Sequence, residues 1–180
     1  MHTELLQGES SEKISSIWID YHREKDCISA AIKGSVYELL KQRLKQWYAH
    51  SSLSSLTLQP RSPRFVVPLP KEPSGFITLV MEAKAKEDIL LFGKLEDYQK
   101  FGSMEAVTPV LTLQYYTELL ETKDLVLMRG DVNGVTTTEA QYLANQLQIF
   151  YLGDDKYRIV KDFNHNPASF NFDDVLQDLK

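Results

Sequence analysis

The prolines of this 180-residue chain are concentrated in one stretch, which limits what the chain can fold into. Five of the seven prolines fall between Pro60 and Pro73. A proline lacks the backbone N–H that a helix interior or a central strand requires. A helix is therefore excluded here, and Pro68 and Pro70 restrict any strand to the edge of a sheet. We predict an extended segment at a sheet edge or on the surface.

Short apolar runs follow this stretch, separated by acidic or glycine-containing turns. They cover residues 75–82, 88–92, 107–114 and 125–129, and residues 27–32 form a similar run before the prolines. Such runs are typical of strands. Closely spaced strands with helices gathered at both ends of the chain predict an α+β fold, with a mainly antiparallel sheet and flanking helices. We also expect a last strand over residues 157–163 and short helices near 96–101 and 170–179.

The first 60 residues carry two helical patterns around the short run at 27–32. Apolar residues spaced for one helix face begin at Ile14, and a second helix is predicted from the Ser35–Glu38 capping box to about residue 48. The expected inward residues are Ile14, Ile17, Trp18 and Tyr21 in the first helix, and Val36, Leu39, Leu40, Leu44 and Trp47 in the second. We therefore divide the chain into a helical N-terminal part (1–60, two helices and a short strand) packed on an α+β sheet core (61–180), forming one structural domain.

Composition excludes several classes of function. The net charge is −5, with nine Lys/Arg against seven Asp/Glu in residues 1–70 and eleven against eighteen in residues 71–180. Nucleic-acid binding requires a basic surface that this distribution does not provide. No apolar run approaches the roughly 20 residues that span a bilayer, so no membrane insertion is expected. The one cysteine, Cys27, excludes an internal disulfide and suits a reducing compartment.

An uncharged helix is predicted after Thr136. Thr136 and Glu139 have the spacing of a capping box, and no charged side chain occurs from residue 140 to residue 153. One face carries the apolar stripe of a core helix. The opposite face and its flank carry Tyr142, Gln146 and Ile149 with Gln141 and Asn145, where a surface helix normally shows Lys and Glu.

Two readings of this second face remain open. The C-terminal segment of the same chain can cover it, as is usual for apolar faces. Alternatively, the five residues Gln141, Tyr142, Asn145, Gln146 and Ile149 contact a partner protein, because interface centres are poor in charge and rich in aromatic residues.

The residues of this chain offer little catalytic chemistry. The four histidines are far apart in sequence, and one cysteine gives no zinc spacing. Cys27 lies among apolar residues and is expected to be an inert thiol rather than the partner of His22. We predict no catalytic residues, no metal and no cofactor. The alternative is a small hydrolase or transferase whose site is assembled by folding from His22, Cys27 or acids, and it requires a pocket that holds at least two such groups.

Three blocks resemble one known family. The longest is Glu139-Ala-Gln-x-x-Ala-Asn-Gln-x-Gln-x-Phe-Tyr151, preceded by Asp124-Leu-Val-Leu-Met-Arg-Gly-Asp131. Trp18-x-x-x-His22 and Pro63-x-Phe65-x-x-Pro68-Leu-Pro70 are the other two. Together they resemble the mitochondrial F1-ATP synthase assembly factor family, the chaperones of the F1 β subunit, over roughly residues 14–170.

The resemblance implies a function without chemistry. It implies a molecular chaperone, not an enzyme, that binds the unassembled F1 β subunit and prevents its aggregation until the α subunit replaces it. It also implies a monomer in the mitochondrial matrix. The N-terminus from Met1 is neither Arg-rich nor free of acids, so we expect no transit peptide in this sequence.

Overall fold

The structure is a computed structural model that describes residue 6 and residues 8–50, 62–84 and 86–177, without the side chains of residues 46–50. The elements in chain order are α1 (Ser11–His22), β1 (Cys27–Lys33), α2 (Gly34–His50), β2 (Arg64–Pro70), β3 (Phe76–Lys84), β4 (Ile89–Lys94), α3 (Leu95–Phe101), the 3₁₀ turn η2 (Met104–Ala106), β5 (Leu111–Tyr116), α4 (Leu120–Lys123), β6 (Leu125–Val132), α5 (Thr137–Leu152), α6 (Asp154–His165) and α7 (Phe172–Leu176).

The described strands form one six-stranded antiparallel sheet in the order β1-β6-β5-β4-β3-β2. Strands β2 to β6 follow one another as a meander, and β1 returns to pair with β6. This confirms the predicted α+β fold with a mainly antiparallel sheet and flanking helices. Strand β1 comes from the N-terminal 60 residues, yet it is a full member of the sheet.

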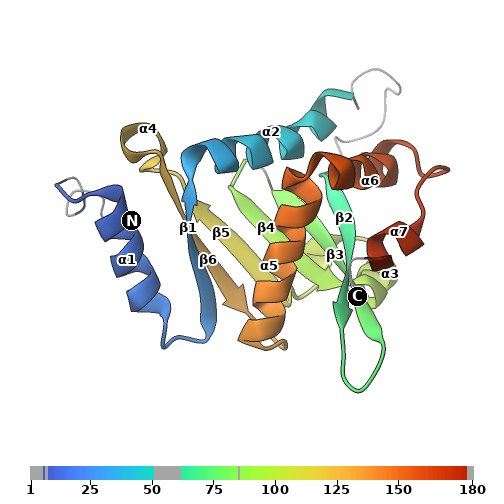
Figure 1. Cartoon of the computed structure of the whole chain (residues 1–180). Helices are drawn as coiled ribbons and strands as arrows, with labels where there is room; N and C mark the ends of the chain where they lie inside the picture. The colour runs from blue at the N-terminus through green and yellow to red at the C-terminus, as the bar shows by residue number, and fades with distance from the viewer. Residues whose placement is uncertain (1–5, 7, 51–61, 85, 178–180) are drawn as a thin grey trace.

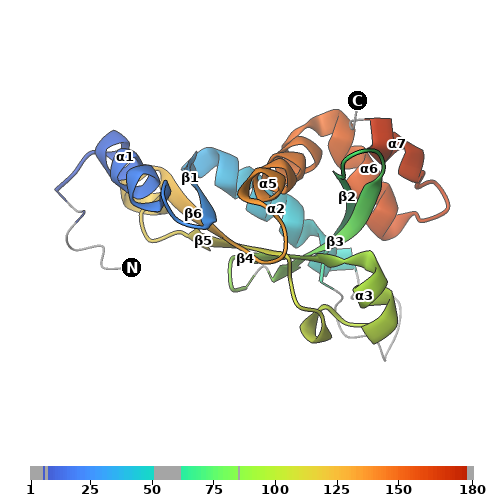
Figure 2. The same cartoon turned by 90° about the horizontal axis from the view of Figure 1, so that it is seen from below.

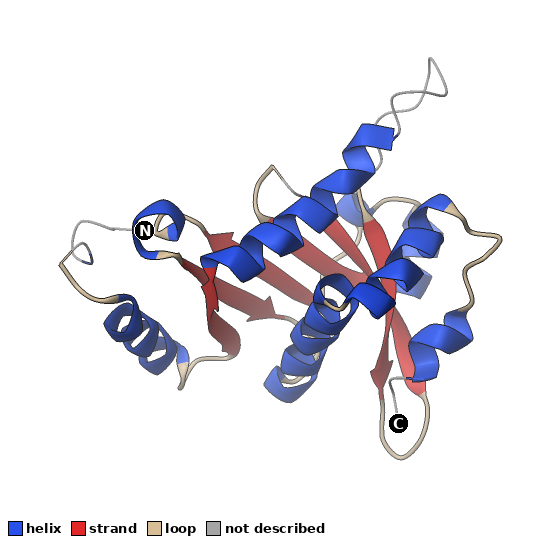
Figure 3. Cartoon of the chain, turned by 45° about the horizontal axis from the view of Figure 1, so that its top comes forward, coloured by secondary structure: helices blue, strands red, loops and turns tan. Residues whose placement is uncertain are grey.

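Helices cover the two faces of the sheet unequally (Figures 1 to 3). Helices α2, α5 and α6 lie over one face, and α3 lies on the other face (Figure 2). Side chains alternate between faces along a strand. Val126 and Met128 of β6 accordingly join the main core with α5, whereas Leu127 joins a smaller cluster with Ile14 of α1. Val66 and Val80 pack under η2 in a third cluster.

The proline-rich segment lies at the sheet edge, as predicted. Among the described strands, β2 is the last of the sheet and pairs with β3 alone. Pro63 and Pro68 are buried, since α6 and α7 pack against this strand, whereas Pro70 and Pro73 are exposed. Pro60 lies outside the described residues.

The segment 157–163 is helical, so the predicted last strand is wrong. Tyr157 and Val160 of α6 are buried three residues apart, and Phe163 packs at the same face. This spacing fits one side of a helix rather than the period-two pattern of a strand. The short helices expected near 96–101 and 170–179 are present as α3 and α7.

The first two helices turn only part of the predicted side chains inward. In α1, Ile14 and His22 are buried and Trp18 is partly buried, while Ile17 and Tyr21 are 45% and 65% exposed. The helix lies at the end of the sheet, so only one narrow line of side chains meets it. In α2, Leu40 and Leu44 are buried and Leu39 is partly buried, as predicted, whereas Val36 is exposed and Tyr37 is buried in its place. The side chain of Trp47 lies outside the described residues.

Candidate functional site

A shallow groove lies between the first half of α5 and the beginning of β1. Eight residues line it: Cys27, Ile28, Ser29, Thr137, Thr138, Gln141, Tyr142 and Asn145. None of them is an Asp, Glu, Lys, Arg or His, and seven offer a hydroxyl, thiol or amide group. The groove therefore presents neutral hydrogen-bonding groups beside apolar surface.

Helix α5 begins at a capping box, as predicted. The Thr136 N–H donates to Glu139 Oε2 at 2.8 Å, and the Glu139 N–H donates to Thr136 Oγ1 at 3.1 Å. Glu139 also forms an ion pair with Lys71, which lies just after β2. The hydrogen bond from Lys71 and that from the Thr136 backbone lower the pKa of the Glu139 carboxyl. The charges at this end of the helix are thus paired within the chain.

The outward face of α5 keeps part of the predicted contact set accessible. Gln141 and Asn145 are exposed and are joined by a hydrogen bond from Gln141 Nε2 to Asn145 Oδ1 at 3.0 Å. Ile149 is 44% exposed, so the C-terminal segment does not cover it. Tyr142 is partly buried and lines the groove. These four residues have the accessibility that partner binding requires, and their contact with a partner stays a prediction.

Gln146 departs from the expected position. Its side chain is only 5% exposed. It lies three residues after Leu143 and four before Phe150, both fully buried, so the helix turns all three toward the interior. Gln146 cannot contact a partner in this conformation, so the candidate surface consists of Gln141, Tyr142, Asn145 and Ile149.

The groups of the alternative enzymatic hypothesis are not brought together in the described part of the chain. His22 is buried against the ring of Trp18, whose carbonyl lies 2.7 Å from His22 Nδ1. Cys27 instead lines the groove beside α5. Within the described ranges no group of three or more His, Cys, Asp or Glu side chains is arranged to hold a metal ion.

One cluster of titratable groups does converge, but it leaves no room for a substrate. The Tyr37 hydroxyl donates to Asp88 Oδ1 at 2.6 Å, and Lys41 Nζ lies 2.7 Å from the same oxygen. Burial, and then the hydrogen bond to Asp88, raises the pKa of the Tyr37 phenol far above its ordinary value. The hollow beside these groups measures about 10 Å³, roughly the space of one water molecule. The cluster joins α2 to the start of β4.

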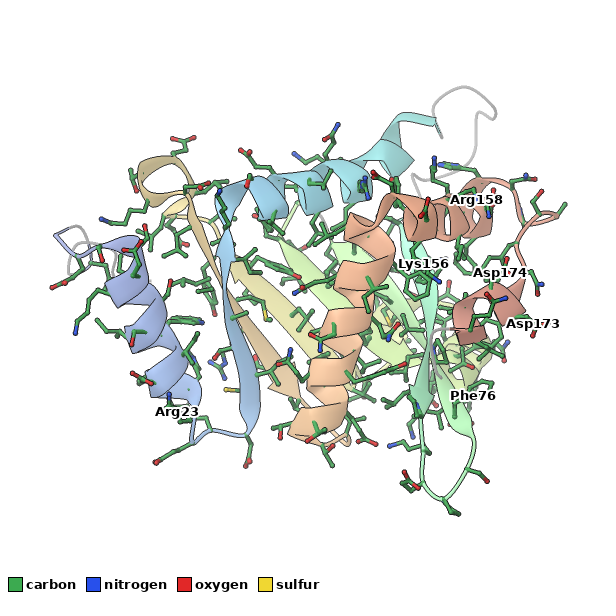
Figure 4. All side chains as sticks on the ribbon, viewed as in Figure 1. Arg23, Phe76, Lys156, Arg158, Asp173 and Asp174 are labelled. Carbon is green, nitrogen blue, oxygen red and sulfur yellow. The ribbon has the colours of Figure 1, made fainter. Side chains whose placement is uncertain are left out.

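Two arginines near the sheet and its helices, Arg43 and Arg64, are bound within the chain. Arg43 of α2 donates to the Tyr151 carbonyl at 2.8 Å, pairs with Asp154 and lies over the ring of Tyr157. Arg64 pairs with Glu82 at 2.6 Å. The Arg43 contacts tie α2 to α5 and α6, and the Arg64–Glu82 pair joins β2 to β3. Figure 4 shows other charged side chains, Arg158, Asp173 and Asp174, at the β2 end of the molecule, away from the groove.

The sequence did not reveal the half of the groove that β1 supplies. Ser29 and Cys27 belong to a run that we read as a buried strand, and Thr137 and Thr138 lie in the first turn of α5. The groove exists because β1 pairs with β6, the strand that leads into α5. No local pattern in residues 27–33 encodes that pairing, although the uncharged lining of α5 was visible.

The comparisons with known proteins identify the family. A family model described as ATP11 protein matches residues 1–176. ATP synthase mitochondrial F1 complex assembly factor 1 of Danio rerio is 32% identical over 184 residues, covering 100% of this chain and 54% of the relative. The protein of the same name from Homo sapiens is 30% identical over 181 residues, covering 98% of this chain and 49% of the relative. The chain belongs to the ATP11 protein family, as its sequence blocks indicated, and spans about half the length of these relatives.

Proposed function

We propose that this chain is a molecular chaperone for the assembly of mitochondrial ATP synthase, and that its client is the unassembled F1 β subunit. Membership of the ATP11 family over residues 1–176 carries this proposal, because the relatives are named F1 complex assembly factors. We further propose that it acts in the mitochondrial matrix as a monomer, and that it prevents aggregation of the β subunit until the α subunit takes its place.

The surface of α5 suits this role. A subunit that lacks its obligate partner exposes the apolar interface that the complete complex buries, and such surfaces aggregate. A chaperone for it needs a surface with apolar side chains and no buried charge. The exposed Ile149, the partly buried Tyr142 and the neutral amides of Gln141 and Asn145 provide such a surface.

No turnover chemistry is required of this protein. Binding and release follow from mass action if the α subunit buries more surface of the β subunit than the chaperone does. We therefore propose a non-enzymatic, ATP-independent chaperone.

None of the described helices is long and apolar enough to cross a membrane.

The proposal is tested with isolated F1 α and β subunits. Light scattering would follow the aggregation of each subunit with and without an equimolar amount of the chain, in the absence of ATP. We expect the chain to suppress aggregation of the β subunit but not of the α subunit. We also expect the β subunit to release the chain when the α subunit is added. Equal suppression of both subunits, or none for the β subunit, would refute the proposal.

A further inference from the structure

The hydrogen-bond register shows which backbone groups of β1 face away from the sheet. The Gly34 N–H donates to the Asp124 carbonyl at 2.9 Å, directly after the last pair of β1 and β6. Along a strand of an antiparallel pair, a residue whose N–H and C=O bond the partner strand alternates with a residue whose N–H and C=O point away from it. Every second residue back from Gly34, including Ala30, therefore directs its N–H and C=O toward β6. Ser29 and Ala31 direct theirs outward.

The outward groups of β1 have no partners among the described residues. Cys27 also directs its backbone groups away from β6, and its N–H donates to the carbonyl of Lys25 at 2.7 Å, in the turn before the strand. No hydrogen bond to a described residue is made by the outward N–H or C=O of Ser29 or Ala31. An open strand edge of this kind is a template for another strand.

The opposite edge of the sheet is closed by three features. Pro68 and Pro70 of β2 have no N–H to offer. The side-chain amide of Asn164 imitates a neighbouring strand at Arg64, because Oδ1 accepts from the Arg64 N–H at 3.2 Å and Nδ2 donates to the Arg64 carbonyl at 2.6 Å. Helices α6 and α7 pack against the same strand. Strand β1 has no proline, and its charged side chain, Lys33, stands at its last position.

The open edge is continuous with the candidate site. Strand β1 lies between α1 and α5 in both Figure 1 and Figure 2. The three residues Cys27, Ile28 and Ser29 at its start line the groove with α5. A strand added at this edge would place side chains against Thr138, Gln141 and the other uncharged residues of the groove. Burying a charged side chain there without a counter-charge is costly, so the occupant must be uncharged where it enters the groove.

We propose that β1 binds an extended, uncharged segment of the unassembled F1 β subunit as an additional strand of the sheet. The main-chain groups of Ser29 and Ala31 would supply the hydrogen bonds, and the groove would select neutral side chains. This proposal rests on the function proposed above and assigns a binding mode to it. A second copy of this chain is the competing occupant, since an open edge can also pair with itself.

Amide hydrogen exchange of the chain tests this directly. The Ser29 and Ala31 amides should exchange quickly in the free chain, while the Ala30 amide is protected by β6. Isolated F1 β subunit at saturating concentration should protect Ser29 and Ala31, and isolated α subunit should not. If the β subunit binds and both amides still exchange quickly, the edge-strand proposal is overturned and the chaperone function stands. If the β subunit does not bind at all, the proposed function itself fails.

Proline substitution separates the edge from the fold. Ser29→Pro removes an N–H that the sheet does not use, so the thermal midpoint should stay close to that of the unmodified chain, and affinity for the β subunit should fall about tenfold, as expected for one or two lost hydrogen bonds. Ser29→Ala keeps the N–H and removes only the hydroxyl, so it should weaken binding clearly less than Ser29→Pro does. Ala30→Pro removes an N–H that bonds β6 and should destabilise the protein.

Three outcomes would overturn the binding mode. The first is normal binding by Ser29→Pro, and the second is equal weakening by Ser29→Ala, which would assign the effect to the hydroxyl. The third is protection of Ser29 and Ala31 in the chain alone, rising with its concentration together with a dimer mass. That result would assign the edge to a second copy.

Discussion

Replacing Asn164 with Ala should open the β2 edge of the sheet. The Asn164 side chain bridges the N–H and the C=O of Arg64, at 3.2 and 2.6 Å, and also donates to the Val160 carbonyl at 2.9 Å. The carbonyl of Val160 can also accept a hydrogen bond from the Asn164 backbone N–H within α6. Losing the side-chain hydrogen bond to Val160 should therefore matter little. The two backbone groups of Arg64 decide the outcome.

The magnitude follows from these two groups. A buried polar group left without a partner costs about 1–3 kcal/mol, and Arg64 is partly buried, so water replaces some of the loss. We expect Asn164→Ala to lower the free energy of unfolding by about 2 kcal/mol. For a chain of this size that corresponds to roughly 4–8 °C in the thermal midpoint.

Urea unfolding gives the free energy, and amide exchange reports the local effect as faster exchange at Arg64. The matched control is Asn166→Ala, because Asn166 is exposed and its side chain bonds only Ser169 among the described residues, at 2.6 Å. It should change stability by less than about 0.5 kcal/mol. A similarly small effect of Asn164→Ala, or unchanged exchange at Arg64, would refute the bridging role.

Three further predictions concern α5 and β1. Ile149→Lys should change the free energy of unfolding by less than about 0.5 kcal/mol and should weaken binding of the F1 β subunit. Gln146→Lys should lower the free energy of unfolding, measured in urea, by about 2–3 kcal/mol, because its position is buried. Undiminished binding by Ile149→Lys would exclude this part of α5 from the interface. The lowered pKa of Glu139 means that its contribution to stability is present above its ordinary pKa of 4.5 and is lost as the pH falls through the lowered value. Glu139→Gln should therefore lose less stability than the unmodified chain between pH 5 and pH 3, and identical losses in urea unfolding would contradict the ion pair as the cause. Gly130→Ala should lower the free energy of unfolding by about 1–3 kcal/mol, because its new Cβ would lie 2.4 Å from Ile28 Cγ1; an unchanged thermal midpoint would show that β1 shifts without cost.

The candidate site was visible in the sequence only where it lies on one helix. The capping box at Thr136 and the absence of charge beyond it predicted a second face of this helix with Gln141, Asn145 and Ile149, and only the structure shows that these three side chains are exposed. Gln146 was assigned to the wrong side, because the buried face of a helix that contacts both a sheet and another helix is wider than a single stripe. How wide it becomes depends on neighbours that the helix's own sequence does not contain.

The sequence by itself determined the features that depend on local backbone chemistry. The prolines placed residues 64–70 at a sheet edge, the short β-rich runs placed β3 to β6, and Thr136 with Glu139 set the start of α5. These outcomes follow from missing N–H groups, side-chain branching and caps, which act within a few residues.

Only the tertiary structure decided how the elements share surfaces. Segment 157–163 became a helix because its apolar residues had α5 and β2 to pack against, and Ile17 and Tyr21 stayed exposed because α1 meets the sheet along one line. Strand β1 became an edge strand of the described sheet because it pairs there with β6 alone, about 100 residues further along the chain. A strand's own sequence specifies its tendency to pair, whereas the partner, and the edge left without one, is set by long-range packing.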